Sequence, residues 1–320
     1  MKNLKNIAAA LLLMITAAAF GQSKVYMTKE ITPESLVKIY KALGVEAKGR
    51  VAVKISTGEG GNTHYLKPTL IRQLVDEVNG TIVECNTAYG GSRQDPKKHW
   101  ETIHEHGFDS IFAVDLMDEF GQIRIPVQDK KHLKYDIVGE HLANYDFMIN
   151  LAHFKGHAMG GFGGVMKNAS IGVASTAGKC YIHSAGKTDD PKLAWGPDYL
   201  AAGKTQDNFL ESMAAAAQAV HNYFGGKVVY INVMNNMSVD CDCDGHPAKP
   251  ELKDMGIMAS LDPVALDQAC LDKVFNYQGK PGDDNKPLIQ RINRQHGTYI
   301  TDYAEQIGLG SKKYVLINID

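Results

Sequence analysis

The sequence predicts an α/β protein with a mostly parallel sheet and helices on both faces. Short apolar runs that are typical of buried strands alternate with longer segments in which apolar residues recur at helical spacing. Such alternation is typical of parallel sheets. After an N-terminal targeting segment, residues 22–320 can bury a large core, so we expect one large domain or two close-packed lobes, with a weakly marked boundary near residue 207.

The expected elements follow in chain order. Strands are expected at residues 51–55, 81–84, 111–115, 147–151, 228–233 and 314–319. The first helix is expected to begin at Pro33, behind the capping residue Thr32, and later helices to cover 67–78 and 207–224 and to begin at Pro263. Residues 179–203 are rich in Gly, Pro, Asp and Ser, so we expect an ordered loop or lid there.

Residues 1–21 have the pattern of a secretory signal peptide. Lys2 and Lys5 precede an apolar run over residues 7–15, and small residues then lead to an expected cleavage site just before Gln22. The apolar run is shorter than the roughly 20 residues that a membrane helix needs. The mature chain is therefore expected to have no membrane span and to be soluble, in the periplasm or secreted.

Charge and cysteine content narrow the function classes. The chain has 34 basic and 36 acidic side chains, and no basic stripe of the kind that binds nucleic acid. Its five cysteines are an odd number and too sparse for a disulfide-stapled domain. A small molecule is therefore the expected partner.

The densest chemical signal follows the strand expected at 147–151. Two histidines and two lysines flank a glycine-rich loop, and a helix that begins at Gly163 or Gly164 would present free amides to an anion. Lys167 would then lie about one turn inside that helix. The alternative is an ordinary surface turn, but the coincidence of several elements favours a site. The candidate binding residues are Lys155, Gly161, Gly163, Gly164 and Asn168, together with Thr63 and Arg93 from loops after two earlier strands.

Two segments resemble the signatures of the domain-of-unknown-function 362 family. They are NLAHFKGHAMGGFGGVMKNASIG at residues 150–172 and DMGIMASLDPVALDQACLD at residues 254–272. The resemblance implies no settled activity, although some members are called iron-sulfur centre proteins. No Cys-x-x-Cys-x-x-Cys run is present here, so a ferredoxin-type cluster is not expected.

A fainter similarity is to the site of the nickel-pincer lactate racemases. Lys167 stands ten residues after His157, and His183 sixteen residues after Lys167, as in the racemase motif. The resemblance implies that His157 moves a proton, that Lys167 anchors a metal cofactor and that His183 binds the metal. The racemases' second proton-moving histidine has no counterpart in residues 86–93, which argues against a two-base racemisation.

A second cluster surrounds Cys241 and Cys243. Extended residues two apart lie roughly 6.6 Å apart, near the upper end of disulfide reach. We therefore expect these two cysteines to be reduced or bound to a soft metal rather than joined to each other. A polar turn with one cysteine bridged elsewhere is an equal alternative.

The leading functional hypothesis is an exported enzyme that uses a metal or organometallic cofactor, with nickel or iron as candidates. It would carry out proton or hydride chemistry on a small anionic, hydroxy-acid-like substrate, as a racemase-like isomerase or an oxidoreductase. One alternative is a non-catalytic metal-binding or redox protein organised by Cys241 and Cys243, and another is a solute-binding protein. The leading hypothesis predicts that His157, Lys167 and His183 meet in one partly buried pocket.

Overall fold

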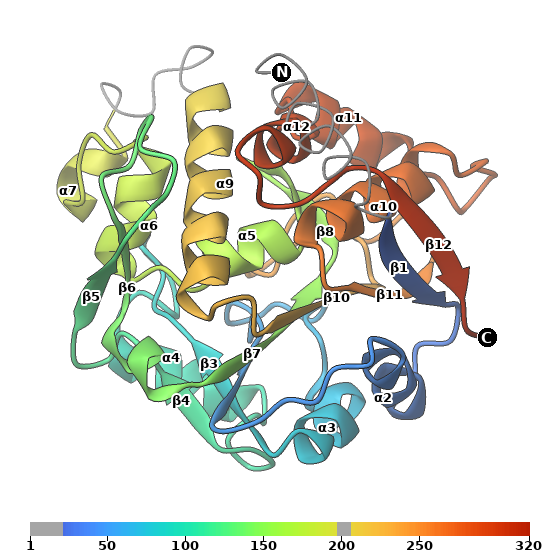
Figure 1. Cartoon of the computed structure of the whole chain (residues 1–320), viewed down its shortest axis with the longest axis horizontal. Coiled ribbons are helices and arrows are strands. Elements are labelled where there is room, and N and C mark those ends of the chain that lie inside the picture. Colours follow the sequence, from blue (N-terminus) through green and yellow to red (C-terminus); the bar gives the residue numbers. More distant parts are fainter. Residues whose placement is uncertain (1–21, 197–205) are drawn as a thin grey trace, which may run out of the picture.

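An eight-stranded sheet forms the centre of the molecule (Figure 1). The computed structural model describes residues 22–196 and 206–320. The strands are β1 (Ser23–Thr28), β2 (Val51–Lys54), β3 (Gly80–Glu84), β4 (Val114–Leu116), β7 (Phe147–His153), β10 (Val228–Met234), β11 (Gly256–Ser260) and β12 (Tyr314–Asn318). Their order is β12-β1-β11-β10-β7-β2-β3-β4. Strand β11 is antiparallel to both neighbours and the other neighbouring pairs are parallel, which confirms the predicted mostly parallel sheet.

Helices cover both faces of this sheet, as predicted. They are α2 (Pro33–Ala42), α3 (Pro68–Glu77), α4 (Pro96–Glu105), η1 (Glu140–Asn144), α5 (Val165–Ser170), α6 (Thr176–His183), α7 (Pro191–Ala194), α9 (Gln206–Tyr223), α10 (Pro263–Phe275), α11 (Lys286–Arg294) and α12 (Tyr299–Gln306). Helices α2 to α4 lie on one side of the sheet, and α5, α6, α9 and α10 lie on the other (Figure 1). Along β2, Val51 and Val53 pack into the core on the side of α2 to α4, and Ala52 packs into the core on the side of α5, α6, α9 and α10. Successive side chains of a strand point to opposite faces of the sheet.

Two small antiparallel ribbons stand apart from the main sheet. One pairs β5 (Gln122–Ile125) with β6 (Asp136–Gly139), and the other pairs β8 (Lys155–His157) with β9 (Gly161–Gly163). The second ribbon directly continues β7, from which a single residue, Phe154, separates it. It therefore holds the first part of the glycine-rich segment at the carboxyl end of β7.

The helix starts follow from local sequence. Thr32 caps α2 through a reciprocal pair of hydrogen bonds with Ser35, and Pro33 takes the first helical position, where a missing amide hydrogen costs nothing. Helix α9 contains a run of alanines and is buried from Phe209 to Val220, which lets it pack closely against α5 and α12. The helices predicted near these positions are confirmed within one or two residues.

Two element predictions need correction. The strand expected at 111–115 is a shorter strand three residues later, β4, because residues 107–113 first turn after α4. The loop expected from residue 179 begins as helix, since α6 is capped by Ser175 and continues to His183. All six residues from Gly178 to His183 are buried, so this helix lacks the one-sided apolar pattern that would have revealed it.

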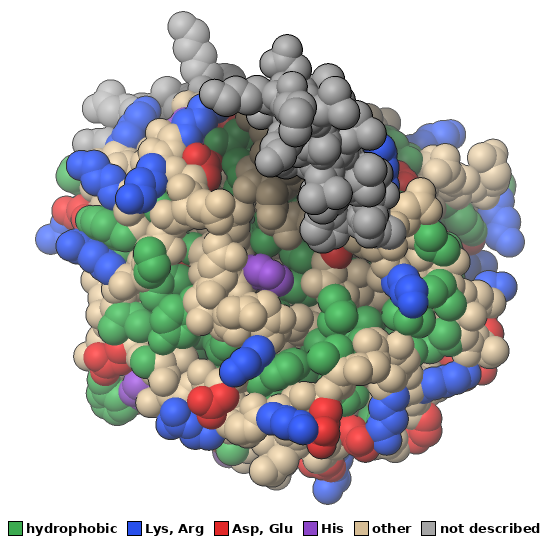
Figure 2. Space-filling view, in the orientation of Figure 1, with side chains coloured by type: hydrophobic (Ala, Val, Ile, Leu, Met, Phe, Trp, Pro, Cys, Tyr) green, Lys and Arg blue, Asp and Glu red, His purple; other side chains and the backbone are tan. Residues whose placement is uncertain are grey.

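The predicted signal peptide, residues 1–21, and the end of the predicted lid, residues 197–203, lie outside the described residues. Within the described part of the chain, no helix combines the length and apolar character required to cross a bilayer. On the face shown in Figure 2, basic and acidic side chains are interspersed, in keeping with the formal charge of −2.

Candidate functional site

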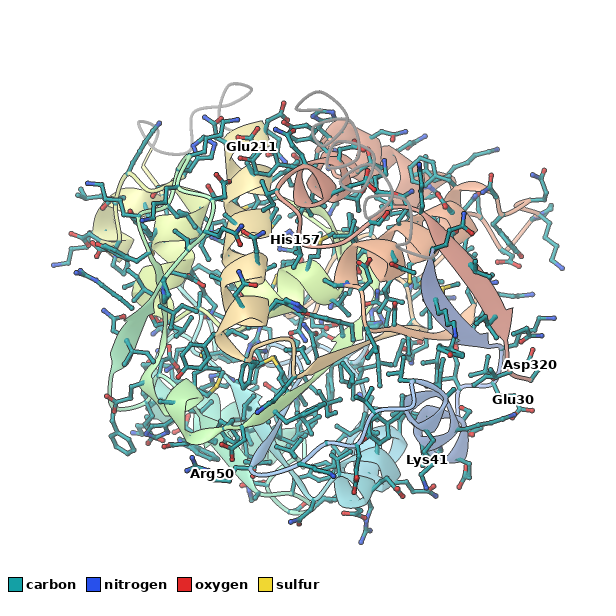
Figure 3. All side chains as sticks on the ribbon, in the orientation of Figure 1. Glu30, Lys41, Arg50, His157, Glu211 and Asp320 are labelled. Atoms are coloured by element: carbon teal, nitrogen blue, oxygen red, sulfur yellow. A yellow bond between two sulfur atoms is a disulfide. The ribbon has the colours of Figure 1, made fainter. Side chains whose placement is uncertain are left out.

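A cavity of about 310 Å³ lies at the carboxyl ends of β2, β3 and β7. The strand ends supply Lys54, Glu84 and His153 to its wall, while the β8–β9 ribbon, α5, α6 and the loop segments 85–93 and 241–243 supply most of the rest. This is where an open parallel sheet places its ligands, because the loops that follow neighbouring strands meet there. His157, Lys167 and His183 all line this one cavity. Figure 3 labels His157 in the middle of the molecule, where the adjoining Gly160 also approaches Met213 of α9.

Lys167 differs from the other lysines of the cavity. Lys54 Nζ is paired with Glu84 at 2.7 Å, Lys155 Nζ with Asp242 at 2.7 Å, and Lys179 Nζ donates to the carbonyl of Ala174 at 2.6 Å. In the described part of the structure, Lys167 Nζ has no hydrogen-bond or ion-pair partner, although it lies in the cavity wall. Burial, followed by the positive charge of Lys155, lowers the pKa of Lys167 to about 7. A large share of this amine is therefore neutral at neutral pH.

Lys155 and His153 are fixed by one carboxylate, that of Asp242. Asp242 Oδ2 accepts from Lys155 Nζ at 2.7 Å and Oδ1 lies 2.8 Å from His153 Nδ1. Burial by itself raises the pKa of Asp242, but the charges of His153 and Lys155 and the hydrogen bonds that they donate hold it well below its usual range. Asp242 was not among the predicted site residues, and its position between two cysteines was the signal that could have identified it.

His157 presents a proton to the cavity. Its Nδ1 accepts a hydrogen bond from the backbone amide of Gly160 at 2.8 Å, so in the neutral ring the proton lies on Nε2. Burial first, and the charge of Lys167 next, hold the pKa of His157 well below its ordinary value. The ring is therefore a neutral hydrogen-bond donor at neutral pH.

His183, at the end of α6, has the opposite arrangement. Its Nδ1 lies 2.7 Å from the carbonyl of Lys179, which can only accept, so Nδ1 carries the proton and Nε2 keeps a lone pair. Burial lowers the pKa of His183 to about 4 although this hydrogen bond favours the charged form. The ring stacks on Phe209 and tilts against Trp195, which fixes its orientation. Such a ring can offer Nε2 to a metal or a donor group.

Arg93 lines the cavity as predicted, but its guanidinium is already engaged. It bonds Glu84 at 3.1 Å and Glu59 at 3.3 Å. Burial raises the pKa of Glu84, yet Lys54 and Arg93 outweigh this and lower it to about 2. Arg93 therefore helps to neutralise the buried carboxylates under the cavity.

The cysteine prediction is wrong. Cys241 and Cys243 form a disulfide with each other, with their Cα atoms 5.2 Å apart. The chain turns here instead of extending, because the amide of Asp244 bonds back to the carbonyl of Cys241, and the turn shortens the expected separation. A ring nitrogen of His157 and both sulfurs lie within 4.8 Å of one another, which resembles a metal site. These three atoms are not a metal site while the disulfide is closed, because its sulfurs lack the thiolate charge that binds metals.

The expected anion site at the start of α5 is filled from within the protein. Gly164 is the N-cap, as predicted, but the amides of Val165 and Met166 donate to the two carboxylate oxygens of Asp267, each at 3.0 Å. Burial raises the pKa of Asp267 to about 6. A Cβ at Gly164 would lie 2.3 Å from Asp267 Oδ1, so the glycine is needed for this contact.

The remaining predicted residues divide between the cavity and its surroundings. Gly163 lines the cavity between the side chains of Lys155 and Lys167, and Asn168 lines it while bonding the carbonyl of Lys54. Gly161 instead packs against the backbone of Gly297. Thr63 is exposed and is not part of the cavity wall.

Among solved structures, the chain is similar to the lactate racemase apoprotein from Thermoanaerobacterium thermosaccharolyticum, with 15% identity and a TM-score of 0.38. That match covers 66% of this chain and 50% of the racemase chain. It is also similar to a structural-genomics protein from Thermotoga maritima, with 12% identity, a TM-score of 0.42, and coverage of 87% of this chain and 59% of the other. The chain thus spans between half and three fifths of the length of these two proteins.

A search of curated proteins finds no significant match. The family described as Domain of unknown function (DUF362), in contrast, matches residues 51–272, which is well over half of the chain and includes both signature segments. The chain therefore belongs to the DUF362 family.

Proposed function

We propose that the protein is an enzyme that binds a small anionic, hydroxy-acid-like substrate in this cavity and carries out proton or hydride chemistry on it with a metal-containing cofactor. The observation that carries the proposal is Lys167, whose pKa is lowered to about 7 and whose amine has no partner among the described residues. A desolvated amine of this kind is a nucleophile or a base at neutral pH. Perturbed, unpartnered groups in a cavity are typical of functional sites.

The charge balance of the cavity supports an anionic substrate. Its wall contains five basic side chains, Lys54, Lys155, Lys167, Lys179 and Arg93, against two carboxylates, Glu84 and Asp242. Because buried charges of one sign are costly without a counter-charge, an anion that enters the cavity relieves this excess. The cavity volume of about 310 Å³ is at the low end for ligand pockets and suits a small molecule.

His157 is assigned the role of an electrophilic donor in this proposal. Since Gly160 donates to its Nδ1, the Nε2 proton is directed away from that bond and can bond a substrate oxygen. A neutral imidazole that donates a hydrogen bond stabilises negative charge as it develops on oxygen. The sequence similarity to the racemases gave His157 a proton-moving role, and the tautomer that the Gly160 hydrogen bond implies favours donation over abstraction.

A cofactor-bound metal fits the site better than a bare ion. His183 Nε2 is the free imidazole nitrogen and Lys167 Nζ the free amine that the described cavity wall offers, while the two cysteine sulfurs are joined. A bare metal ion requires three or four protein ligands. A cofactor that supplies its own ligands needs only one protein nitrogen on the metal and an anchor such as Lys167. When bound, such a group would supply an electron-pair acceptor next to the substrate.

Export remains part of the proposal. A disulfide between Cys241 and Cys243 is in keeping with an oxidising compartment, where signal peptides deliver proteins. The predicted cleavage before Gln22 would release the chain there.

The test is ligand binding followed by chemistry, on protein purified from its native source so that a cofactor is retained. Calorimetric titration with D-lactate and L-lactate should give binding that Lys167→Ala weakens at least about tenfold. Lys187→Ala, which removes an exposed lysine, should leave the affinity unchanged. Equal affinity in both variants, or no binding of either lactate or pyruvate, would contradict the proposal.

Nuclear magnetic resonance in D₂O separates an enzyme from a solute-binding protein. The enzyme is expected to exchange the Cα hydrogen of lactate or, with an added two-electron acceptor to take the hydride, to convert lactate to pyruvate, and Lys167→Ala to abolish either change. Binding without exchange or conversion would overturn the enzymatic proposal in favour of solute binding.

A further inference from the structure

The Cys241–Cys243 disulfide occupies the wall of the same cavity without an evident structural task. The ring that it closes contains one intervening residue, Asp242. A disulfide stabilises a fold mainly by shortening the loops of the unfolded chain, and a ring this small removes little of that freedom. The disulfide therefore contributes little to the stability of the fold.

Other contacts already hold the surrounding segment. Lys155 and His153 hold the carboxylate of Asp242, and the backbone carbonyl of Asp242 accepts a hydrogen bond from the backbone amide of Glu59 at 2.7 Å. Asn62 Nδ2 also donates to the carbonyl of Asp244 at 2.7 Å. Because none of these bonds involves a sulfur, the segment can keep its place when the disulfide is opened.

The two sulfurs have different surroundings. Cys241 is 4% exposed, and its Sγ accepts from the backbone amide of Cys243 at 3.2 Å. Cys243 is the more exposed partner. A hydrogen bond to Cys241 Sγ favours its thiolate, and the lysines of the cavity wall favour negative charge on either sulfur. Cys241 is therefore the better leaving group and Cys243 the more accessible sulfur for attack.

We propose that Cys241–Cys243 is a redox-active disulfide that exchanges with small thiols carrying a carboxylate. The thiolate RS⁻ attacks Cys243 Sγ, the S–S bond breaks, and Cys241 leaves as a thiolate. A second RS⁻ attacks the substrate-derived sulfur of the resulting mixed disulfide, and the bond from that sulfur to Cys243 Sγ breaks, which releases RSSR and the Cys243 thiolate. In the net reaction two RSH are oxidised to RSSR and the protein disulfide is reduced to two thiols. The substrate carboxylate is recognised by the same excess of lysines that defines the cavity.

Carboxylate recognition is tested on the folded full-length protein by comparing 3-mercaptopropionate with 2-mercaptoethanol. Samples are alkylated at intervals, and peptide mass mapping gives the fraction of Cys241 and Cys243 that is reduced. Per thiolate, 3-mercaptopropionate is expected to react at least about tenfold faster, and high salt to remove the preference. Reduction only after denaturation, or equal rates for the two thiols, would overturn the proposal.

The order of attack is tested with two matched variants and 3,3′-dithiodipropionate. Cys241→Ser leaves the accessible Cys243, which should form a mixed disulfide with the reagent and release one thiol. Cys243→Ser leaves the buried Cys241 and should form the adduct more slowly. Equal or reversed rates would overturn the assignment of Cys243 as the attacked sulfur. The carboxylate preference shares the lysine excess with the proposed function, but reduction and adduct formation are read from cysteine mass, so their failure is distinguishable from failure of lactate binding or of chemistry at Lys167.

Discussion

Replacement of Lys167 by Met should stabilise the protein, and most strongly in acid. In the folded state the pKa of Lys167 falls from an ordinary value of 10.5 to about 7, because burial and Lys155 disfavour the charged amine. Above the unfolded-state pKa both states hold a neutral amine, and the lysine costs nothing. As the pH falls below it, the unfolded chain binds a proton first, so the cost of the lysine to folding grows until the pH passes the folded pKa, and below that it stays at its full value.

The size of the effect follows from the two pKa values. One pKa unit corresponds to about 1.4 kcal/mol, so the full cost of Lys167 is on the order of 5 kcal/mol near pH 6 and about 2 kcal/mol at pH 9. Met retains the length of the side chain without the charge. Lys167→Met is therefore expected to raise the free energy of unfolding by amounts of this order and to lose lactate binding.

Urea unfolding at pH 6 and pH 9, followed by circular dichroism, measures the difference in the free energy of unfolding between Lys167→Met and wild type. Lys187→Met, at an exposed position, should show no pH-dependent gain. A Lys167→Met protein that is no more stable than wild type at pH 6, or whose gain is the same at both pH values, would refute the view that a desolvated amine occupies the cavity.

Three further predictions concern the supports of the site and the N-terminus. Asp242→Asn leaves Lys155 and His153 without their carboxylate and should lower the free energy of unfolding in urea by about 3–5 kcal/mol. Because the folded pKa of Asp242 is lowered, this difference from wild type should be constant above the unfolded pKa of about 4 and should narrow as the pH falls below it. A difference that widens in acid would contradict the pairing. Gly164→Ala places a Cβ 2.3 Å from Asp267 Oδ1, so it should lower the thermal midpoint more than Gly308→Ala, which has open space around its Cβ but a positive φ; a smaller effect at Gly164 would argue against the Asp267 cap. Protein purified from its native source should begin at Gln22 by N-terminal sequencing, and a chain from that source that retains Met1 would disprove cleavage.

Much of the fold could be predicted because local rules and tertiary structure agree. Thr32 and Pro33 start α2 where their chemistry predicts, and the apolar runs at β7 and β10 form the middle of the sheet. Strands β1 and β11 escaped prediction, and β11, with all five of its residues buried in Gly-Ile-Met-Ala-Ser, has no alternation to reveal it. Periodicity is informative only when one side of an element faces water.

The convergence of His157 and Lys167 on one cavity was predictable because one continuous glycine-rich segment, which also contains Gly163, carries them to the sheet edge. The long-range partners were not predictable from spacing, since Asp242 and Asp267 reach this segment from about a hundred residues away in the chain. The disulfide was missed because strand geometry was assumed where the chain turns between Cys241 and Asp244. Turn geometry therefore decides whether two cysteines at this spacing can join.

The most direct test of a cofactor-bearing anion site is intact mass combined with metal analysis on protein purified from its native source. We predict a metal in stoichiometric amount and a mass above that of the mature chain, with the added mass mapped by peptide analysis to Lys167 and lost in Lys167→Ala. A metal-free protein with the mass of the unmodified mature chain would contradict the proposal that Lys167 anchors a metal-containing cofactor.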